Sequence, residues 1–486
     1  MLKTETLALL CDYYELTMGR GYFHSGMADK IMYFDVFYRS VPDGGGYAVF
    51  AGLEQVVKYI ENLRFDGSDI EYLRTKGVFD DEFLDYMKDF RFTGDIIAVP
   101  EGTVVFPGEP VLTVRAPAVQ AQLVETYILL CINHQSLIAT KASRMVRAAA
   151  GRPISEFGSR RAHGEDAAVM GARAAYIGGC AGTACALSDK LFGVPASGTM
   201  AHSWVQMFDS EYDAFVEYLK LYPDSPTLLV DTYNVLKSGV PNAIKAIKDT
   251  LHPMGQRKCA IRIDSGDITY LTKRARAMLD EAGLTDCKII VSNSLDEYII
   301  LEILRQGAQV DAFGIGERLI TARSESVFGG VYKLAAVEGD NGEIIPKIKV
   351  SENIEKITNP GFKKVYRFYN KDNGKAEADL ICLNDETVSE GEPYELFDPD
   401  YTWKRKTIEN YTARELRVPV VKDGKCVYDF PTLTDVRDYC ASEIGTMWEE
   451  VLRFEKPHEY YVDLSEKLWK LKHEMISSHT GTARRI

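Results

Sequence analysis

Hydrophobic and polar positions divide the chain into three zones with different periodicities. In the first zone, residues 1–150, Lys30–Arg39 is rich in apolar and aromatic residues, as strands are. Asp95–Ala116 has the pattern of paired strands interrupted by glycine and proline. Ala118–Gly151 carries apolar residues at helical spacing and ends at a glycine. We therefore expect the first zone to be an α+β segment.

Short apolar runs alternate with helical patterns through the second zone, residues 151–335. Repeated strand–helix units imply a parallel sheet with helical crossovers. Six strands, with a seventh candidate at Gly178–Ala186, favour a barrel but leave an open sheet as the alternative. The expected strands are Pro153–Gly158, Pro195–Thr199, Thr227–Asp231, Cys259–Asp264, Lys288–Asn293 and Val310–Phe313. The expected helices are Glu165–Ile177, His202–Leu221, Pro241–Leu251, Ile268–Ala282 and Tyr298–Arg305.

The third zone, residues 336–486, returns to strand patterns and then to charged helices. Ile345–Val350 and Lys364–Phe368 are expected strands, and residues 433–455 and 463–476 are expected helices. We expect this zone to pack back on the α+β first zone, beside the α/β domain of residues 151–335.

Polar and glycine residues follow the expected strands of the second zone at their C-terminal ends. Parallel α/β folds place their ligands at this edge. We therefore expect the functional site there. The groups are Gly158-Ser159-Arg160, Thr199-Met200-Ala201-His202, Asp231-Thr232, Asp264-Ser265-Gly266-Asp267, Ser292-Asn293 and Gly314-Ile315-Gly316.

Composition narrows the class of protein. Of 486 residues, 57 are Lys or Arg and 71 are Asp or Glu, giving a net charge of −14. This charge disfavours nucleic acid or an anionic membrane surface as a partner. An anionic small substrate would need a local basic pocket. The hydrophobic fraction of 46% is ordinary for a globular protein and excludes disorder as the main state.

Cysteine, histidine and hydropathy patterns point to a cytoplasmic protein without a zinc site of its own. The nine cysteines form no C-x-x-C pair, and the eight histidines form no metal-ligand cluster. Any metal should therefore arrive with a substrate. No stretch approaches the ~18 apolar residues of a membrane-spanning helix. Leu7–Cys11 is too short for the core of a signal peptide, so we expect no leader.

Two motifs at the expected ligand edge suit phosphate binding, although each has an ordinary structural alternative. Arg160-Arg161 offers guanidinium groups to phosphate or carboxylate, and the alternative is a surface salt bridge. Gly314-Ile315-Gly316 lets backbone N–H groups approach phosphate oxygens, and the alternative is a tight turn. Neither common nucleotide-binding glycine pattern is present.

Histidine and aspartate residues at the same edge suit catalysis. His202 opens a helix after a strand, where it would serve as nucleophile, base or phosphate ligand, or simply as a cap. Asp264 and Asp267 bracket a turn that suits a ribose diol or Mg²⁺–pyrophosphate, or simply a helix N-cap. Arg262 lies on the same strand face as Asp264.

Taken together and in order, these motifs closely resemble those of nicotinate phosphoribosyltransferases. The matching blocks span nearly the whole chain. The resemblance implies an irregular, incomplete α/β barrel plus a second domain built from the N- and C-terminal segments. The blocks are DYYELTM (12–18), SEFGSRRAHG (155–164), GTMAHSW (198–204), LVDTYN (229–234), IRIDSGD (261–267), VSNSLDE (291–297), FGIGERLIT (313–321) and VFGGVYKL (327–334).

The resemblance also implies a reaction. Such enzymes join nicotinate to 5-phosphoribosyl 1-pyrophosphate, giving nicotinate mononucleotide and pyrophosphate, the first step of NAD salvage from nicotinate. ATP is a co-substrate, hydrolysed through a transient phosphohistidine, and Mg²⁺ accompanies the pyrophosphate. Family members are typically homodimers with the active site at the subunit interface. Nucleic acid and membranes are not expected partners.

Site residues carry over motif by motif. The catalytic residues implied are His202 as the phosphorylated histidine, Asp231 as the carboxylate that orients its imidazole, and Asp264 on the ribose or Mg²⁺–pyrophosphate side. Tyr14, from the neighbouring subunit, and Phe157 would sandwich the pyridine ring, with Thr199 and Arg262 contacting nicotinate. The implied phosphate-binding residues are Arg160, Gly314, Gly316 and Thr321.

Close alternatives differ at single positions. Nicotinamide phosphoribosyltransferases have a similar order of motifs, but in their pattern Gly-Thr is followed by Asp and a Glu precedes the reactive histidine. Ala184 and Ala201 stand at these positions here, which favours the acid over the amide. A quinolinate enzyme would need a denser basic pocket. A non-catalytic binding protein would be signalled by loss of His202, Asp231 or Asp264. The roles of His163 and Glu317 are not assigned.

Overall fold

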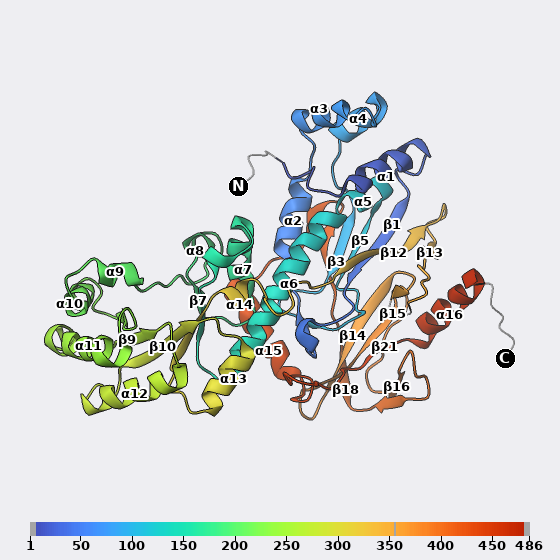
Figure 1. Ribbon diagram of the computed structural model, residues 1–486. Coiled ribbons are helices and arrows are strands. Elements are labelled where there is room, and N and C mark those ends of the chain that lie inside the picture. Colours follow the sequence, from blue (N-terminus) through green and yellow to red (C-terminus); the bar gives the residue numbers. More distant parts are fainter. Residues whose placement is uncertain (1–5, 354–355, 481–486) are drawn as a thin grey trace. The chain divides into compact units, whose positions relative to one another are not determined.

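The computed structural model describes residues 6–353 and 356–480, which divide into two units (Figure 1). Unit 1 comprises Met1–Leu137 with Val327–Ile486, and unit 2 comprises Ile138–Ser326. The boundaries predicted from the sequence pattern, 150/151 and 335/336, lie later in the chain than these divisions. The three-segment division itself stays a prediction.

Unit 2 is built on a six-stranded parallel sheet, so the mixed α/β fold predicted for it is confirmed. The strand order is β7-β6-β11-β10-β9-β8. Because all strands run in one direction, their C-terminal ends share one edge. The strands are β6 (Ile154–Glu156), β7 (Gly182–Thr183), β8 (Thr227–Leu229), β9 (Ala260–Ile263), β10 (Lys288–Asn293) and β11 (Ala312–Ile315).

The segment expected to form a strand at Pro195–Thr199 makes only a single parallel bridge, from Ala196 to Thr183. Serine, glycine and threonine fill most of this segment, and serine and glycine have low strand propensity. Within residues 6–353 and 356–480, no ladder joins this segment to β8. The sheet is therefore open between this segment and β8, and closure into a barrel stays a prediction.

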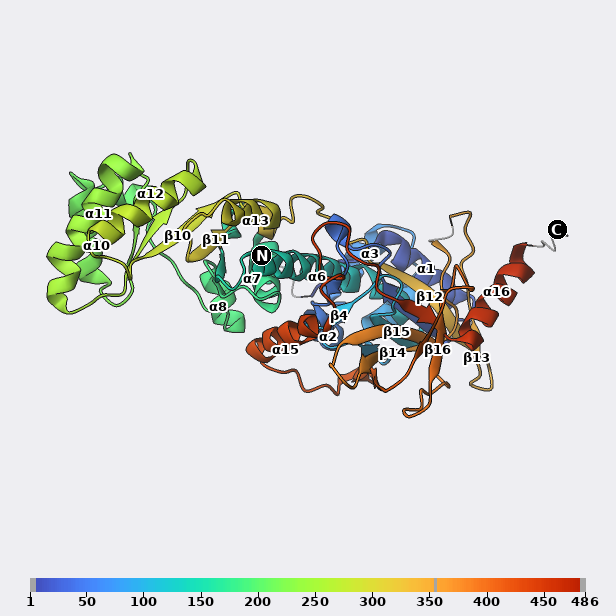
Figure 2. The same ribbon diagram turned by 90° about the horizontal axis from the view of Figure 1, so that it is seen from below.

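Helices connect the strands of unit 2. Helices α10, α11 and α12 pack beside one another (Figure 2). The helix expected over His202–Leu221 is in fact two, because Ser210 starts a new helix by accepting a hydrogen bond from the backbone N–H of Asp213. The helices are α7 (Glu165–Ile177), α8 (Ala186–Phe192), α9 (His202–Gln206), α10 (Glu211–Leu221), α11 (Val240–Ala246), α12 (Ile268–Glu281), α13 (Glu297–Arg305) and α14 (Glu317–Ile320).

The local sequence explains where these helices start and how closely they pack. Asp267 caps α12 by accepting the Tyr270 N–H, and Asp296 caps α13 through Ile299. Short π-helical turns, η3 (Val235–Gly239) and η4 (Ile247–Leu251), flank α11. A Cβ at Gly239 would overlap the carbonyl oxygen of Val230, so only glycine allows this approach to the strand.

Unit 1 contains a seven-stranded antiparallel sheet with the order β13-β12-β1-β5-β3-β19-β20. Three strands from the N-terminal part of the chain, β1, β5 and β3, form its centre, and two strands from the C-terminal part flank them on each side. A second pair of strands, β2 (Ala48–Val49) and β4 (Val104–Val105), lies apart from it. The strands of the large sheet are β1 (Ile31–Phe37), β3 (Asp95–Ala98), β5 (Leu112–Pro117), β12 (Val331–Glu338), β13 (Ile344–Pro346), β19 (Val418–Lys422) and β20 (Lys425–Cys426).

A four-stranded sheet, β18-β14-β15-β21, and a hairpin of β16 and β17 complete the strands of unit 1. The helix expected from residue 463 begins later, because Val462–Leu464 is a strand, and the helix expected to reach 455 ends at Thr446. These elements are β14 (Lys363–Asn370), β15 (Ala376–Leu383), β16 (Tyr394–Phe397), β17 (Arg405–Ile408), β18 (Tyr411–Glu415), β21 (Val462–Leu464), α15 (Leu433–Thr446) and α16 (Glu466–Thr480).

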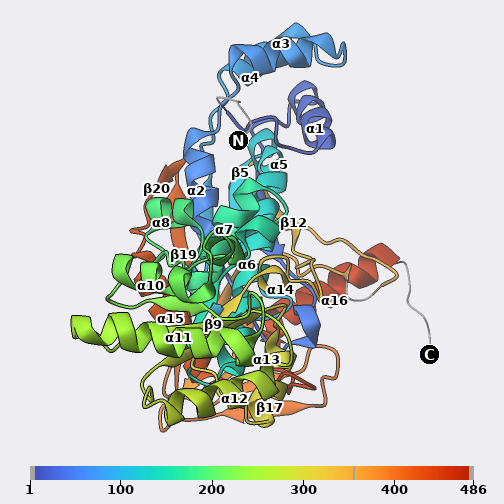
Figure 3. The ribbon, with the colours of Figure 1, turned by 60° about the vertical axis from the view of Figure 1, so that its left-hand side comes forward.

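The N-terminal helices of unit 1 include a small cluster in which α3 and α4 pack together beside α1 (Figures 1 and 3). Helix α6 is long and runs from unit 1 into unit 2. No helix among the described residues has the length and apolar character needed to cross a membrane. The bounds are α1 (Tyr13–His24), α2 (Leu53–Asn62), α3 (Gly67–Thr75), α4 (Asp81–Lys88), α5 (Ala118–Leu123), α6 (Glu125–Ala148) and the single-turn η1 (Pro42–Gly44).

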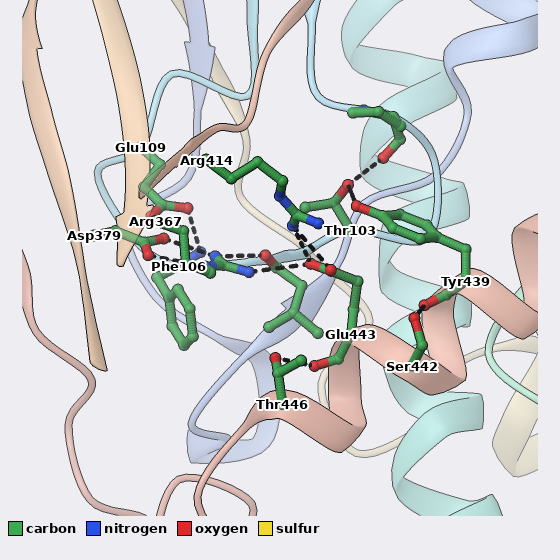
Figure 4. Close-up of polar contacts among 12 residues, drawn as sticks. Thr103, Phe106, Glu109, Arg367, Asp379, Arg414, Tyr439, Ser442, Glu443 and Thr446 are labelled. Carbon is green, nitrogen blue, oxygen red and sulfur yellow. Dashed lines mark hydrogen bonds and ion pairs between the residues drawn. The ribbon is translucent and has the colours of Figure 1, made fainter. Parts of the chain in front are cut away.

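A buried ion cluster ties the four-stranded sheet to α15 and to β4 (Figure 4). Arg367 on β14 is fully buried and donates to both oxygens of Asp379, at 2.8 and 2.6 Å. It also donates to Glu443 on α15 at 3.3 Å, and Arg414 donates to the same carboxylate at 2.8 Å. Because each buried charge has a partner, the cluster fixes how these elements pack.

Candidate active site

The C-terminal edge of the parallel sheet opens into a cavity of about 480 Å³ within unit 2. Polar or glycine residues were found after six expected strands in the sequence. All of these groups contribute to the cavity except the one that follows β8. Seven of the predicted site residues line it: Phe157, Arg160, Thr199, Arg262, Asp264, Gly314 and Gly316. Its other lining residues are Ser159, Arg161, Ala184, Ser197, Gly198, Met200, Ala201, Ser292, Asn293, Ser294 and Glu317.

One wall of the cavity is the ring of Phe157, which lies directly over Gly314. The backbone N–H of Phe157 donates to the Ile315 carbonyl at 2.7 Å, continuing the β6–β11 pairing past the end of β6. A Cβ at Gly314 would overlap two carbons of the ring. Gly314 therefore makes room for an aromatic side chain, in addition to any part it takes in phosphate binding.

The turn after β6 is held by Glu156, a residue that the sequence analysis did not single out. Its carboxylate is fully buried and accepts hydrogen bonds from the backbone N–H of Gly158 and from Thr183 Oγ1, the latter at 2.7 Å. Burial raises the pKa of Glu156, and these two donors oppose the rise. The available signal was an acidic residue near the end of a predicted strand of the sheet.

Arg262 on β9 crosses the cavity floor to the 198–201 segment. It donates to Thr199 Oγ1 at 2.5 Å and to the Met200 carbonyl at 3.0 Å. Burial lowers the pKa of Arg262, whereas the nearby Asp264 and Asp231 carboxylates raise it. An arginine remains a cation under such shifts. Arg262 and Thr199, which were each predicted to contact nicotinate, are thus in direct contact with each other, although 63 positions separate them.

Two aspartates build the turn between β9 and α12. Asp231, after β8, accepts the backbone N–H of Asp264 at 2.9 Å and Ser265 Oγ at 2.8 Å through one oxygen, Oδ2. Asp264 Oδ1 accepts Ser292 Oγ at 2.5 Å. Asp264 Oδ2 receives no hydrogen bond from the described residues. Asp231 thus positions the Asp264 turn, and Asp264 keeps one oxygen available at the cavity.

His202 begins α9 and is half-buried, but its side chain does not line the cavity. Its Nδ1 lies 3.2 Å from Thr232 Oγ1. The sequence-based expectation was that Asp231 orients this imidazole. In the structure the hydrogen-bond partner is instead Thr232, the next residue, because the Asp231 carboxylate is directed to the Asp264 turn. A functional pairing of His202 with Asp231 stays a prediction.

Charged side chains surround the cavity mouth. Arg160 and Arg161 follow β6 and are exposed, and their guanidinium groups make no hydrogen bond or ion pair with the described residues. Glu317 accepts Ser294 Oγ at 3.0 Å and pairs with Arg323 at 2.8 Å. These donors lower the pKa of Glu317, Ser294 most strongly. Because the Glu317 carboxylate is already paired, it repels an anion bound nearby less strongly than a free carboxylate would.

Three other residues named from the sequence lie outside the cavity lining. Thr321 ends α14 and donates its hydroxyl to the Glu317 carbonyl at 2.7 Å, so that hydroxyl closes the helix. His163 is exposed in the turn before α7. Tyr14 is an exposed residue of α1 in unit 1. Roles of Thr321 in phosphate binding and of Tyr14 in ring stacking stay predictions.

The groups that line the cavity suit a flat anionic ring and a phosphorylated sugar. An aromatic face and a guanidinium group suit a ring that carries a carboxylate. The two uncommitted arginines suit phosphate groups. The free oxygen of Asp264 suits a ribose hydroxyl or a hydrated divalent cation. This combination of groups has the chemistry that a heteroaromatic acid and a sugar phosphate would require of a binding site.

Comparison with known proteins agrees with this chemistry. Residues 9–133 match the N-terminal domain of nicotinate phosphoribosyltransferase (NAPRTase), residues 153–370 match the nicotinate phosphoribosyltransferase family, and residues 362–472 match the C-terminal domain of that enzyme. The matches cover all the motif blocks described above. They also include the strands of both units.

Individual relatives are similar over nearly their whole length. The chain is 43% identical to a nicotinate phosphoribosyltransferase of Bacillus subtilis, with 98% of this chain and 96% of the relative covered. It is 34% identical to one of Caenorhabditis elegans, with 96% and 93% covered. Its fold is similar to the crystal structure of human nicotinic acid phosphoribosyltransferase, at 27% identity and a TM-score of 0.83, covering 96% of this chain and 100% of that one.

Proposed function

Because the chain belongs to the nicotinate phosphoribosyltransferase family and is an enzyme of that type, we propose that it joins nicotinate to 5-phosphoribosyl 1-pyrophosphate in the unit 2 cavity. The products are nicotinate mononucleotide and pyrophosphate. One observation carries the assignment of the site: the Phe157 ring, seated on Gly314, and the guanidinium of Arg262 line one cavity.

Nicotinate would bind with its ring against Phe157 and its carboxylate near Arg262 and Thr199. Arg262 already donates to Thr199 Oγ1, so the hydroxyl can in turn donate its own proton to the substrate carboxylate. A charge-assisted hydrogen bond of this kind is stronger than a neutral one. Stacking holds the ring in a fixed plane, so that its nitrogen is held in line with the ribose.

The sugar phosphate would bind beside the ring, with Arg160 and the backbone of Gly316 on the phosphate side and Asp264 on the ribose side. The lone pair of the nicotinate nitrogen forms the bond to ribose C1 as the bond from C1 to the pyrophosphate oxygen breaks. No proton moves at the nitrogen, so no general base is required there. Arginine and backbone N–H groups stabilise the charge of the departing pyrophosphate.

Mg²⁺ is the cofactor proposed here, and the residues present fit it. One carboxylate, Asp264, borders the cavity with a free oxygen. Mg²⁺ commonly binds through one or two carboxylates together with water and substrate phosphates, so a single protein ligand is sufficient. When bound, it neutralises pyrophosphate charge. The chain's own contribution is to hold Asp264 in place through Ser292 and Asp231.

ATP is the proposed co-substrate, and His202 the proposed phosphorylated residue. A nitrogen of the imidazole would attack the γ-phosphorus, forming an N–P bond as the bond to ADP breaks. Water later cleaves the N–P bond and releases phosphate, which restores His202. Support comes from its position at the start of α9, adjoining the cavity-lining segment 197–201, and from its partly exposed ring.

Selection of nicotinate over nicotinamide is proposed to depend on the absence of a carboxylate beside the ring site. Ala184 borders the cavity where the amide-using relatives are expected to carry Asp. A carboxylate there would repel the nicotinate carboxylate. A homodimer with the active site at its interface, with Tyr14 supplied by the neighbouring subunit, and a cytoplasmic location are likewise proposed on the family resemblance.

The experiment that tests the phosphohistidine is replacement of His202. In the His202→Ala variant, ATP should no longer accelerate mononucleotide formation, while slow ATP-independent transfer continues. His473→Ala, an exposed histidine of α16, is the matched control and should keep full ATP stimulation. Persistent stimulation in His202→Ala would rule out this residue as the phosphoryl carrier without affecting the assignment of the transferase reaction.

A further inference from the structure

Unit 1 contains a second large cavity, of about 1020 Å³, that has no part in the reaction proposed above. It lies among the β16–β17 hairpin, the segment leading into β21, the turn around η1, and Phe106 with Pro107. Ligand cavities in proteins commonly have volumes of about 300–1,000 Å³, so the space is sufficient for a small organic molecule.

Asp463 on β21 is the feature of this cavity that indicates a ligand. Its side chain lines the cavity, it is 6% exposed, and it receives no hydrogen bond or ion pair from the described residues. Burial, with a smaller contribution from the nearby Asp398, raises the pKa of Asp463 to about 7, although Lys406 opposes the rise. A buried carboxylate without a donor is costly, so a donor from outside the chain would be favoured.

Other buried acids of unit 1 differ from Asp463 because they accept hydrogen bonds from protein donors. Asp379 accepts hydrogen bonds from Arg367 and from Tyr460. Glu443 accepts from Arg367 and Arg414 (Figure 4). These carboxylates are satisfied within the protein. Asp463 faces open space instead, which is the arrangement expected of a group that binds something.

The cations near Asp463 are each paired with another acid, and Lys406 offsets only part of the rise in the pKa of Asp463. The hairpin side chains also show that this region accepts an ammonium group against aromatic rings: the ammonium of Lys404 lies 4.2 Å from the centre of the Tyr401 ring. Each hairpin cation has an acid of its own, Lys404 with Asp398 at 3.4 Å, Lys406 with Glu377 at 2.7 Å, and Arg405 with Glu395.

The walls near Asp463 provide an apolar surface. The rings of Phe106 and Tyr460 stack with centres 3.9 Å apart and both line the cavity, and Tyr461 adds a further ring. We propose that this cavity is a binding site for an organic cation, a primary ammonium group carried on an aromatic or apolar body. The ammonium pairs with Asp463, and the apolar body packs against the exposed ring of Tyr461, which stands beside the buried Phe106–Tyr460 stack.

Two probes of nearly equal shape test the charge requirement: 2-phenylethylamine, which is a cation at neutral pH, and 2-phenylethanol, which is neutral. Ligand-observed NMR titration of the full chain, with nicotinate present at saturation to block the unit 2 cavity, should detect the amine and not the alcohol. Equal binding of both probes, or binding of neither, would overturn the proposal.

The Asp463→Asn variant tests whether the Asp463 carboxylate binds the ammonium group. It is nearly isosteric and removes an unpaired buried charge, so it should fold with unchanged or higher thermal stability. Its affinity for 2-phenylethylamine should fall by about tenfold or more, as expected for loss of a charge-assisted hydrogen bond. Asp385→Asn, an exposed acid paired with Lys467, carries the same charge change and should bind like the unsubstituted chain. An unchanged affinity in Asp463→Asn would refute the site.

Discussion

The ring of Phe157 occupies the space that a side chain at residue 314 would need. Gly314→Ala should therefore displace the ring, and a shift of about 1 Å in a positioning group can cost about 100-fold in rate. We expect kcat/KM for nicotinate to fall by about that factor, as measured by steady-state kinetics. Gly445→Ala, at a helical glycine whose added Cβ would meet nothing within 4 Å, is the control and should have little effect.

Arg262 should matter to the acid substrate more than to the sugar phosphate. A hydrogen bond to a charged group contributes about 1.5–3 kcal/mol, so Arg262→Ala should raise the KM for nicotinate by about 10- to 100-fold. Arg262→Lys should recover only part of this, because lysine lacks the two-pronged geometry that reaches Thr199 and Met200. Equal increases in the KM for both substrates would place Arg262 on the phosphate side or make its role structural.

Ser292 is expected to position Asp264. Its hydroxyl donates to Asp264 Oδ1 at 2.5 Å and would be lost in Ser292→Ala. We expect about a tenfold loss of kcat/KM for 5-phosphoribosyl 1-pyrophosphate and a shift in the Mg²⁺ concentration required, with the melting temperature nearly unchanged. Ser238→Ala, which removes an exposed hydroxyl in the same unit, is the control. Normal Mg²⁺ dependence in Ser292→Ala would contradict the positioning role.

Much of unit 2 could be predicted from the sequence because its periodicity is strong. Lys288–Asn293 and Glu165–Ile177 form with the predicted bounds. The prediction of a strand at Pro195–Thr199 was wrong, because this segment contains residues of weak strand propensity and makes only one bridge. The break between α9 and α10 was missed because the helical pattern continues across Ser210, whose capping role depends on one hydrogen bond.

The site was predictable as a set of residues at one sheet edge, but its contacts were not. Parallel strands bring their C-terminal ends together, which places Arg262, Asp264 and Gly314 around one cavity. Which side chains bond to each other depends on distances of a few ångströms. The pairing of His202 with Thr232 and the buried Glu156 that holds the turn are details of this kind.

The buried cluster around Arg367 should dominate the stability of unit 1. Arg367→Met would leave Asp379 without the guanidinium that bonds both its oxygens and would remove one of the two arginines of Glu443, and breaking a buried ion pair costs about 3–5 kcal/mol. We expect a clear fall in the urea midpoint of the transition that reports on unit 1. Arg305→Met removes an exposed pair with Glu302 and should cost less than about 1 kcal/mol. Similar midpoints for the two variants would show that the cluster adds little.

The most direct test is to supply purified protein with 5-phosphoribosyl 1-pyrophosphate, Mg²⁺ and ATP, together with either nicotinate or nicotinamide. Mononucleotide, pyrophosphate and ADP are then measured by chromatography in each reaction. Mononucleotide from nicotinate alone, with ADP formed alongside it, is the predicted result. Mononucleotide mainly from nicotinamide, or none from either base, would contradict the proposed reaction.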